Sequence, residues 1–249
     1  MIPQEIESKL LQAVALIKSS SHTTVFTGAG VSVESGIPPF RGKDGLWSRI
    51  DPVFLDTMYF SRYPEESWKL IKHIFYDFFG NAKPNRAHYA LARLEENQLL
   101  RTVITQNIDN LHQAAGSRDV IEYHGTSRKL ICTHCGQVFD ATEALLENIP
   151  PLCQNCSSVL KPCFVFFGEP IPEEANIRSL NEAREADLFI VIGTTGEIQP
   201  ASMIPIIASE NGAKIIEINV EESRYTSSIT DLFLKGRATE IMGYLLESL

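Results

Sequence analysis

The chain has 249 residues, of which 44% are hydrophobic, and carries a formal net charge of −9. This length and composition favour one large globular domain, with or without small insertions, and exclude an intrinsically disordered chain. The acidic balance argues against direct nucleic-acid binding, and no run reaches the roughly 18 uninterrupted apolar residues that a membrane span requires.

The N-terminal segment predicts an amphipathic helix rather than a targeting signal. The apolar positions that recur at helical spacing are Ile6, Leu10, Val14 and Ile17. Acidic residues in the stretch 4–9 fit neither a secretory leader nor an arginine-rich transit peptide. Because we also expect the cysteines to stay reduced, the sequence predicts a cytoplasmic protein.

A glycine-rich turn follows the first β-branched run. Thr23–Thr27 predicts a strand, and Gly28-Ala29-Gly30-Val31-Ser32 comes directly after it. Glycine lets backbone N–H groups approach a phosphate closely, so a strand followed by such a turn and then a helix favours phosphate binding. Val33 stands where the usual dinucleotide motif has its third glycine, and no strand ending in an acidic residue follows about 20 positions later. The turn is therefore not typical of an ordinary dehydrogenase.

Further short apolar runs alternate with helical patterns along the chain. The expected strands are Thr23–Thr27, Thr102–Thr105, Val120–Tyr123, Phe164–Phe167, Leu188–Ile192 and Lys214–Ile218. Runs without polar alternation are typical of strands buried on both faces of a parallel sheet. The expected helix ends are Asn85, Gly116, Pro200 and Gly212. The sequence therefore predicts an α/β fold with a doubly wound, Rossmann-like parallel sheet.

Two segments interrupt this alternation, and we expect them to form a smaller lobe. Residues 40–82 have a helical pattern rich in aromatic side chains, and residues 125–162 hold two pairs of cysteines. The predicted division is a Rossmann-like domain of residues 1–39, 83–124 and 163–249. A helical insert at 40–82 and a zinc-binding insert at 125–162 would form the small lobe.

Two C-x-x-C pairs predict a zinc ribbon. They are Cys132 with Cys135 and Cys153 with Cys156, separated by residues 136–152. Four thiolates complete a tetrahedral site and leave no open position, so the expected metal is structural. Disulfides or a redox pair are the alternatives, although neither pair opens a helix beside a βαβ unit. We expect Cys163, at the start of a strand, to be an inert buried thiol.

Polar residues follow several of the expected strands, at the edge where parallel sheets bind ligands. They lie at 106–109, after the strand ending at Thr105, and at His124 with Gly125. Two more groups, at 193–196 and 219–221, follow the strands ending at Ile192 and Ile218. So many convergent polar ends favour a nucleotide lying along this edge of the sheet.

The motifs and their order resemble those of the sirtuin family. They are the segment 28–32, Gly36-Ile37-Pro38-x-Phe40-Arg41-Gly42, Thr105-Gln106-Asn107-Ile108-Asp109-x-Leu111-His112, Glu122-Tyr123-His124-Gly125, the paired C-x-x-C and Val165-Phe166-Phe167-Gly168-Glu169. The match extends from Thr23 to about Ala238. The chain is similar to compact prokaryotic-type sirtuins, which are NAD-dependent protein-lysine deacylases.

The resemblance implies NAD as cofactor and acyl-lysine proteins or peptides as substrates. In sirtuins the acyl oxygen attacks the nicotinamide ribose, nicotinamide leaves, and a histidine then acts as general base on a ribose hydroxyl. His124 matches that base and Asn107 is the second implied catalytic residue. From the residues alone, His124 could be an ordinary core histidine, and Asn107 and Asp109 could cap the next helix.

The binding residues are likewise implied by the resemblance. The cofactor set is Gly28, Ala29, Gly30, Ser32, Phe40, Arg41, Gln106, Asn107, Ile108, Asp109, Gly193, Thr194, Thr195, Asn219, Val220, Glu221 and Ala238. The substrate set, in a groove expected between the lobes, is Val165, Phe167, Gly168, Glu169 and Ile198. Alternatively, the apolar run at 164–167 is only a buried strand and Arg41 only a solvated loop charge.

Two departures from the family pattern bear on the substrate. Gly196 and Glu197 stand where typical sirtuins carry bulky apolar residues, and Glu197 predicts a preference for a basic flank. Desuccinylating sirtuins carry a Tyr-x-x-Arg pair a few residues after a tryptophan. Counting from Trp68, the corresponding positions here are occupied by Ile71 and Ile74. Apolar residues cannot pair a succinyl carboxylate, so we expect a small neutral acyl group, most simply acetyl.

Other readings use the same residues. Transfer of ADP-ribose to a protein and plain NAD hydrolysis need the same ribose-binding groups, and only the product separates them from deacylation. A zinc-braced module that binds ADP-ribose or acyl-lysine without turnover is the non-enzymatic alternative.

Overall fold

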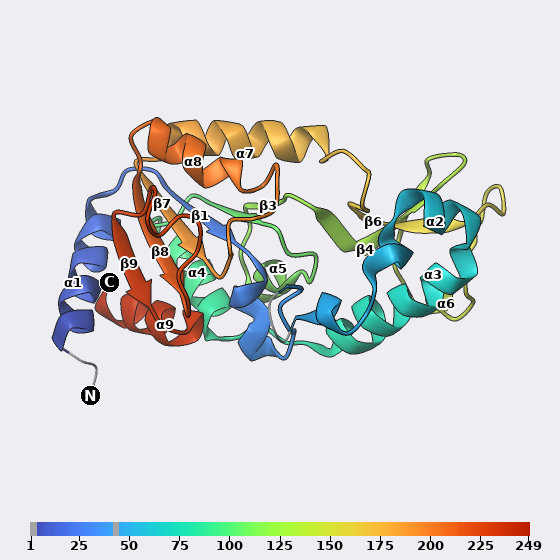
Figure 1. Ribbon diagram of the computed structural model, residues 1–249, viewed down its shortest axis with the longest axis horizontal. Helices are drawn as coiled ribbons and strands as arrows, with labels where there is room; N and C mark the ends of the chain where they lie inside the picture. The colour runs from blue at the N-terminus through green and yellow to red at the C-terminus, as the bar shows by residue number, and fades with distance from the viewer. Residues whose placement is uncertain (1–3, 42–44) are drawn as a thin grey trace.

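The computed structural model describes residues 4–41 and 45–249 and divides them between two lobes (Figure 1). The larger lobe contains a six-stranded sheet, and the smaller one contains a three-stranded sheet covered by helices. Among the described residues, no helix is long and apolar enough to cross a membrane.

All neighbouring strands of the large sheet run parallel. They are β1 (Thr23–Thr27), β2 (Thr102–Thr105), β3 (Val120–Glu122), β7 (Leu188–Ile192), β8 (Lys214–Asn219) and β9 (Leu232–Lys235). Their spatial order is β3-β2-β1-β7-β8-β9. This is the doubly wound order, which confirms the predicted fold class. The order reverses between β1 and β7, and such sheets bind ligands beyond the carboxyl ends at this point.

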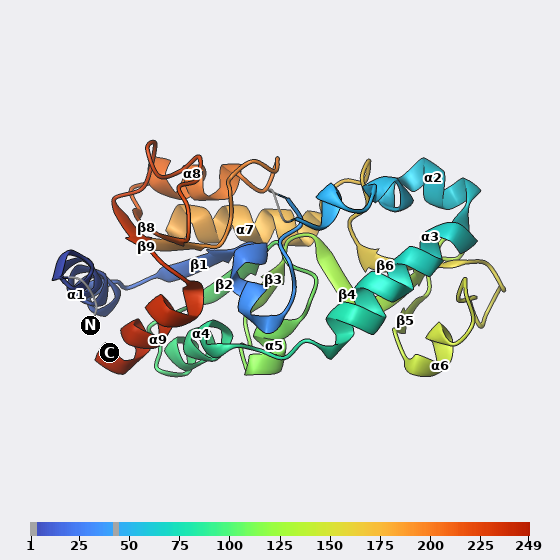
Figure 2. The same cartoon turned by 60° about the horizontal axis from the view of Figure 1, so that its bottom comes forward.

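Helices cover both faces of the large sheet (Figure 2). One face carries α1 (Gln4–Ser19), α4 (Arg86–Glu96) and α9 (Ala238–Ser248), whereas α7 (Glu173–Glu185) and α8 (Met203–Glu210) cover the other. Val25 of β1 packs in the first core and Phe26 in the second, as expected because successive strand residues face opposite ways. The short α5 (Leu111–Ala115) lies beside α4 and ends at Gly116, as predicted.

The small lobe combines segments from both insertions around one core. The first insertion forms α2 (Thr57–Arg62), α3 (Pro64–Ile71) and a π-helical continuation, Lys72–Phe78. The second forms β4 (Gly125–Cys132), β5 (Val138–Asp140), α6 (Glu143–Leu146) and β6 (Leu160–Phe164). Trp68 from α3 is fully buried, and its indole N–H donates to the Leu160 carbonyl oxygen at 2.8 Å.

One predicted strand is wrong. The run Phe164–Phe167 does not form a strand of the large sheet, because β6 ends at Phe164 and pairs antiparallel with β4. Phe164 and Phe166 are nevertheless buried, in the aromatic core of the small lobe. A fully apolar run indicates burial but does not say which sheet supplies it. The predicted boundary between residues 162 and 163 consequently falls inside β6.

Three smaller expectations also differ from the structure. The helix after the glycine-rich turn is a 3₁₀ helix, Ala29–Ser35. Pro200 precedes α8 without opening it, since α8 begins at Met203. The edge strand β9 was not predicted, because four residues with mixed burial give little signal.

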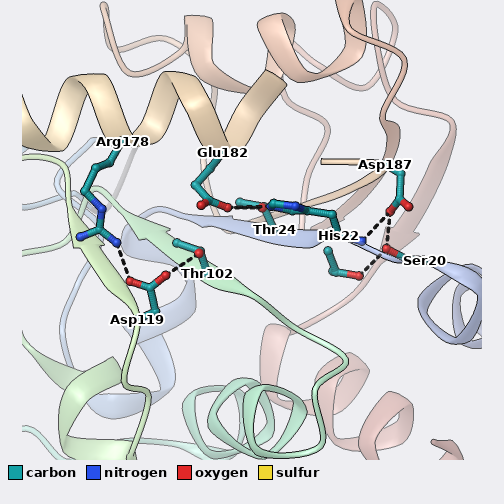
Figure 3. A network of polar contacts seen from close by, with 9 residues as sticks. Ser20, His22, Thr24, Thr102, Asp119, Arg178, Glu182 and Asp187 are labelled. Atoms are coloured by element: carbon teal, nitrogen blue, oxygen red, sulfur yellow. Dashed lines mark hydrogen bonds and ion pairs between the residues drawn. The ribbon is translucent and has the colours of Figure 1, made fainter. Parts of the chain in front are cut away.

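Polar contacts at the amino end of the sheet join the starts of β1 and β7, and a separate group joins those of β2 and β3 (Figure 3). The Asp187 carboxylate accepts hydrogen bonds from the backbone N–H and hydroxyl of Ser21, at 2.9 and 2.6 Å, and from the backbone N–H of His22 at 3.1 Å. Partial burial would raise the pKa of Asp187, but hydrogen bonds from Ser20 and Ser21 hold it below its usual value. The network therefore secures the sheet at the edge opposite the carboxyl ends.

Candidate functional site

The glycine-rich turn lies directly against the loop that follows β7. The Gly30 N–H donates to the Gly193 carbonyl oxygen at 2.8 Å, and the Gly28 N–H donates to the Ile192 carbonyl oxygen at 3.0 Å. A Cβ on Gly30 would lie 2.5 Å from the Gly193 Cα, and a Cβ on Gly193 would lie 2.6 Å from Gly30. Glycine is therefore required at both positions for the two loops to touch at the switch point of the sheet.

A first, much smaller cavity of about 10 Å³ opens on one side of this contact. Its lining residues are Ala29, Ser32, Ile37, Phe40, Phe79, Asn107, Ile108 and Asp109. The structure thus brings six members of the predicted cofactor set together. Ile37 was quoted only as part of a motif, and Phe79 was not identified, because its aromatic-rich segment gave no sign of which ring would face the site.

Three polar side chains form one wall of this cavity. The Ser32 hydroxyl donates to an Asp109 carboxylate oxygen at 2.6 Å, and the Asn107 amide donates to the Ser32 oxygen at 3.1 Å and the Gly28 carbonyl at 3.2 Å. Burial raises the pKa of Asp109, and the Ser32 hydrogen bond opposes that effect. Asp109 also accepts from the Leu111 N–H at 3.0 Å and so contacts the first turn of α5, although the N-cap position itself is Asn110.

Two buried histidines lie beneath the wall. The rings of His88 and His112 are 4.9 Å apart, and His112 Nε2 is 3.0 Å from the Thr27 hydroxyl. Burial lowers the pKa of His88 to about 4, and burial together with the nearby His88 lowers the pKa of His112 well below its usual value. Both rings are therefore neutral at pH 7. His88 was missed because it sits within an ordinary helical pattern.

A second cavity of about 340 Å³ opens on the other side of the glycine contact. It is lined by Gly30, Val33, Glu34, Gly193, Ile218, Asn219, Val220, Gly236, Arg237 and Ala238. Half of this lining was in the predicted cofactor set. Glu34 and Arg237 were not, and their side chains form an ion pair at 3.7 Å. Spacing along the chain could not show that residues so far apart meet.

Hydrogen bonds link the loops that follow β2, β7 and β8. The Gln106 amide donates to the Thr194 hydroxyl at 3.1 Å, and the Asn219 amide donates to the Thr194 carbonyl at 3.0 Å. Other predicted cofactor residues lie outside both cavities. Arg41 and Thr195 are exposed, and Glu221 is an exposed partner of Lys235 at 3.5 Å. Gly42, the last residue of its motif, lies outside the described residues.

His124 follows β3 and is oriented by a backbone contact. Its Nδ1 atom is 3.0 Å from the carbonyl oxygen of Gln106, whose neighbour Asn107 lines the first cavity. Burial lowers the pKa of His124, and the hydrogen bond to Gln106 opposes that effect. The ring is half-buried rather than enclosed in the core.

The predicted substrate segment leads away from His124. The Val165 N–H donates to the His124 carbonyl at 2.9 Å, and the Phe167 N–H donates to the Leu55 carbonyl at 2.9 Å. Phe167 is 43% exposed, and Gly168 is also exposed. Ile198 is half-buried in the separate loop between β7 and α8.

The four paired cysteines form one cluster in the small lobe. Their sulfur atoms all lie within 4.8 Å of one another, with 3.5 Å between Cys132 and Cys156 and 3.7 Å between Cys135 and Cys153. A tetrahedral zinc with Zn–S bonds of about 2.3 Å places its ligands about 3.8 Å apart, so the cluster fits this ion. Cys163 lies outside the cluster and is half-buried, less enclosed than predicted.

Comparisons with known proteins find relatives that match most of the chain. The model of the Sir2 family matches residues 28–200. A protein of Pyrobaculum aerophilum named NAD-dependent protein deacylase 2 is 46% identical over 93% of this chain and 92% of its own. A Sir2 homologue mutant in complex with ADP ribose superposes with a TM-score of 0.90 at 43% identity, covering 95% of each chain. A Sir2 complex with a p53 peptide and NAD⁺ superposes with a TM-score of 0.87 at 35% identity, covering 95% of this chain and 96% of the other.

Proposed function

This chain belongs to the Sir2 family, the sirtuins, and on that premise we propose which residues carry out its reaction. The chain is an NAD-dependent protein-lysine deacylase. The reaction both cleaves NAD and transfers an acyl group, giving nicotinamide and O-acyl-ADP-ribose. The role of each side chain in the reaction and the identity of the acyl group are proposals.

The two cavities would hold the two halves of NAD. The first, with the polar wall of Ser32, Asn107 and Asp109, is about 10 Å³ in this structure and would widen to take the nicotinamide and its ribose. The second would take the adenosine, with Asn219 and Ala238 in its lining. The close contact of Gly30 with Gly193 joins the two loops between these cavities, and the pyrophosphate would lie along them. Bound there, NAD supplies an electrophilic ribose carbon.

His124 is the proposed general base. The observation that carries the assignment is its Nδ1 contact with the Gln106 carbonyl, at the edge of the cofactor site. A carbonyl oxygen can only accept, so Nδ1 carries the hydrogen and Nε2 keeps its lone pair. A neutral imidazole in this orientation can remove a proton from a ribose hydroxyl. Asn107, in contact with Gly28 and Ser32, would orient the ribose.

Peptide substrates would bind at the segment after β6. Val165 and Phe167 would line the channel for the lysine side chain, while Gly168 and Glu169 offer backbone groups to an extended peptide. The loop containing Ile198 would form the opposite side of the groove. Backbone pairing of this kind tolerates many sequences.

We assign β6 to the small lobe, because it pairs with β4. The lobe division at 39/40, 82/83 and 124/125 is therefore kept, and the last boundary moves beyond Phe164.

The acyl group is proposed to be small and neutral. Ile71 and Ile74 are 0% and 2% exposed and lie in the core of the small lobe. Neither side chain can form an ion pair with the carboxylate of a succinyl group. An unpaired buried charge costs about 3 kcal/mol or more, equivalent to about 100-fold. The kcat/KM for an acetyl-peptide should therefore exceed that for the matching succinyl-peptide by about this factor, and equal values would refute the assignment.

Product analysis tests the function as a whole. The chain would be incubated with NAD and an acetyl-peptide, and O-acetyl-ADP-ribose should appear together with deacetylated peptide and nicotinamide. ADP-ribose attached to protein would indicate a transferase instead, and free ADP-ribose alone would indicate a hydrolase. Binding of ADP-ribose without turnover would indicate a binding module.

We also propose a cytoplasmic location, since a thiolate zinc site is typical of reducing compartments. Cell fractionation would test this location.

A further inference from the structure

The ammonium group of Lys161 is enclosed behind the proposed substrate segment. Its Nζ donates to the carbonyl oxygens of Pro162 at 3.0 Å and Phe164 at 2.9 Å, and pairs with a Glu169 carboxylate oxygen at 3.0 Å. The side chain is 13% exposed, and Nζ lies 4.1 Å from the centre of the Phe166 ring. A lysine ammonium has three N–H donors, so these three acceptors satisfy it completely.

Glu169 closes a tight turn around this cation. The carboxylate oxygen that faces Lys161 also accepts the Phe166 N–H at 2.7 Å, and the Glu169 N–H donates to the Phe166 carbonyl at 3.0 Å. Gly168, between them, has a φ of +92°, a conformation that favours glycine. The salt bridge therefore fixes the backbone of residues 164–169 from one side.

The other side of the same segment is tied to the catalytic lobe and to the helical insertion. Val165 is held by the His124 carbonyl, and Phe167 exchanges backbone hydrogen bonds with Leu55 and Thr57, at 2.9 and 3.2 Å. Phe167 and Gly168 nevertheless remain open to solvent. The segment is thus rigid where it meets the protein and exposed where a peptide would add.

Stability alone does not account for a charged group in this place. Removing two charges from water costs about as much as their attraction returns, and apolar residues of the same size often stabilise equally well. Burial lowers the pKa of Lys161, and the neighbouring Glu169 carboxylate opposes that effect. What the cation adds is a defined backbone geometry, because it holds two carbonyl groups and one carboxylate in place at once.

We propose that Lys161, acting through Glu169, is a positioning residue that presets residues 164–169 to receive the acyl-lysine peptide. This inference rests on the proposed substrate segment. The lysine itself touches neither NAD nor peptide, so its loss should weaken peptide binding while NAD binding is unchanged. The consequence is a selective effect on one of the two substrates.

Steady-state kinetics with three variants test the proposal. Lys161→Met keeps the apolar stem and removes the charge, and the KM for an acetyl-peptide should rise about tenfold while the KM for NAD stays within about twofold. Lys161→Arg keeps a cation with several donors and should recover most of the loss. Lys129→Met, on the neighbouring strand β4, removes an exposed lysine and should behave like the wild type.

The outcomes separate this inference from the function on which it rests. A wild-type chain that forms no acyl-ADP-ribose refutes the function, whatever the variants do. A working wild type with an unchanged peptide KM in Lys161→Met refutes the positioning role, as does an equal rise of both KM values that arginine does not rescue. If Lys161→Met fails to fold, Glu169→Gln decides, because its amide oxygen can still accept the Phe166 N–H but carries no negative charge to hold the ammonium. An unchanged peptide KM in that variant overturns the proposal, and a selective rise supports it.

Discussion

The Nδ1 atom of His124 lies 3.0 Å from the carbonyl oxygen of Gln106, and this contact determines which ring nitrogen is available for chemistry. The acceptor holds the hydrogen on Nδ1, and burial keeps the ring neutral by lowering the pKa of His124. The next residue, Asn107, lines the first cavity. One backbone carbonyl therefore connects the orientation of the proposed base to the wall of the cofactor site.

Removal of the imidazole should stop turnover without preventing cofactor binding. For His124→Ala we expect kcat to fall about 10²- to 10⁴-fold, the usual contribution of a general base. Calorimetric titration should show that ADP-ribose still binds. Because burial lowers the pKa of His124, the acid limb of wild-type kcat/KM should lie below pH 6.5. His73→Ala, at an exposed helical position, is the matched control, and equal losses in both variants would contradict the assignment.

A single methyl group should separate the two loops at the switch point. Gly30→Ala would place its Cβ 2.5 Å from the Gly193 Cα, so the loops must move apart and NAD binding should weaken at least about tenfold. Gly80→Ala is the control, since nothing lies within 4 Å of the Cβ that it would add. Fluorescence titration with NAD measures both variants. Similar affinity in the two would show that the close contact is not needed for the cofactor.

The small lobe should depend on its metal. Elemental analysis of the purified chain should find about one zinc per molecule, and exhaustive chelation should lower the melting temperature, because structural zinc contributes directly to folding. Cys153→Ala should lose the metal and the stability together. Cys163→Ala, outside the cluster, should retain both. Full thermal stability in a sample free of zinc would refute the structural role.

Acid should destabilise the fold through its buried histidines. The pKa of His88 falls from 6.5 to about 4 on folding, so as the pH drops the unfolded chain takes up the proton first. The contribution of neutral His88 to the free energy of unfolding is complete above about pH 6.5 and is lost as the pH falls toward 4. The loss is about 1.4 kcal/mol per pH unit, so about 2 kcal/mol is lost by pH 5. His112 acts in the same direction, whereas the raised pKa of Asp109 acts in the opposite one.

Urea unfolding at pH 7 and pH 5 measures this loss. His88→Gln removes the titrating group, so the free energy of unfolding of this variant should change less between the two pH values. The same change as in the wild type would exclude His88 as a source of the acid sensitivity.

The exposed Glu197 should favour substrates with basic residues beside the acyl-lysine. We expect kcat/KM for an acetyl-peptide flanked by lysine to exceed that for a glutamate-flanked peptide by a few-fold, about what an exposed ion pair contributes. Glu197→Gln should reduce the preference, as should high salt. Glu210→Gln, at the exposed end of α8, should not. Equal turnover of both peptides by the wild type would exclude the charge effect.

Local pattern predicted the buried framework better than the cavities. β1, β2 and β7 have the predicted bounds because their uninterrupted apolar or β-branched runs suit only strands covered on both faces. The run at 164–167 has the same composition, yet the chain turns at Gly168 and only Phe164 and Phe166 are buried, in the small lobe. The composition of a segment indicates that it contains buried residues, but the segments that cover them lie elsewhere in the chain and cannot be identified from it.

The functional residues divide in the same way. Residues within a motif, such as Asn107 and Asp109, were identified because their neighbours mark them. Phe79, Glu34 and Arg237 line the cavities through contacts between distant segments, and nothing adjacent to them indicates it. Lys161 was likewise missed, since a lysine within a strand reads as an ordinary surface charge.

The core of the small lobe is assembled from two insertions that lie far apart in the chain. Trp68 and Phe60 belong to the first, whereas Leu130, Leu160 and Phe164 belong to the second. During synthesis the helical segment emerges from the ribosome well before the strands that cover it. Its aromatic face therefore stays uncovered while the following helix and strands are made, and this interval is when a nascent chain would most need protection by a chaperone.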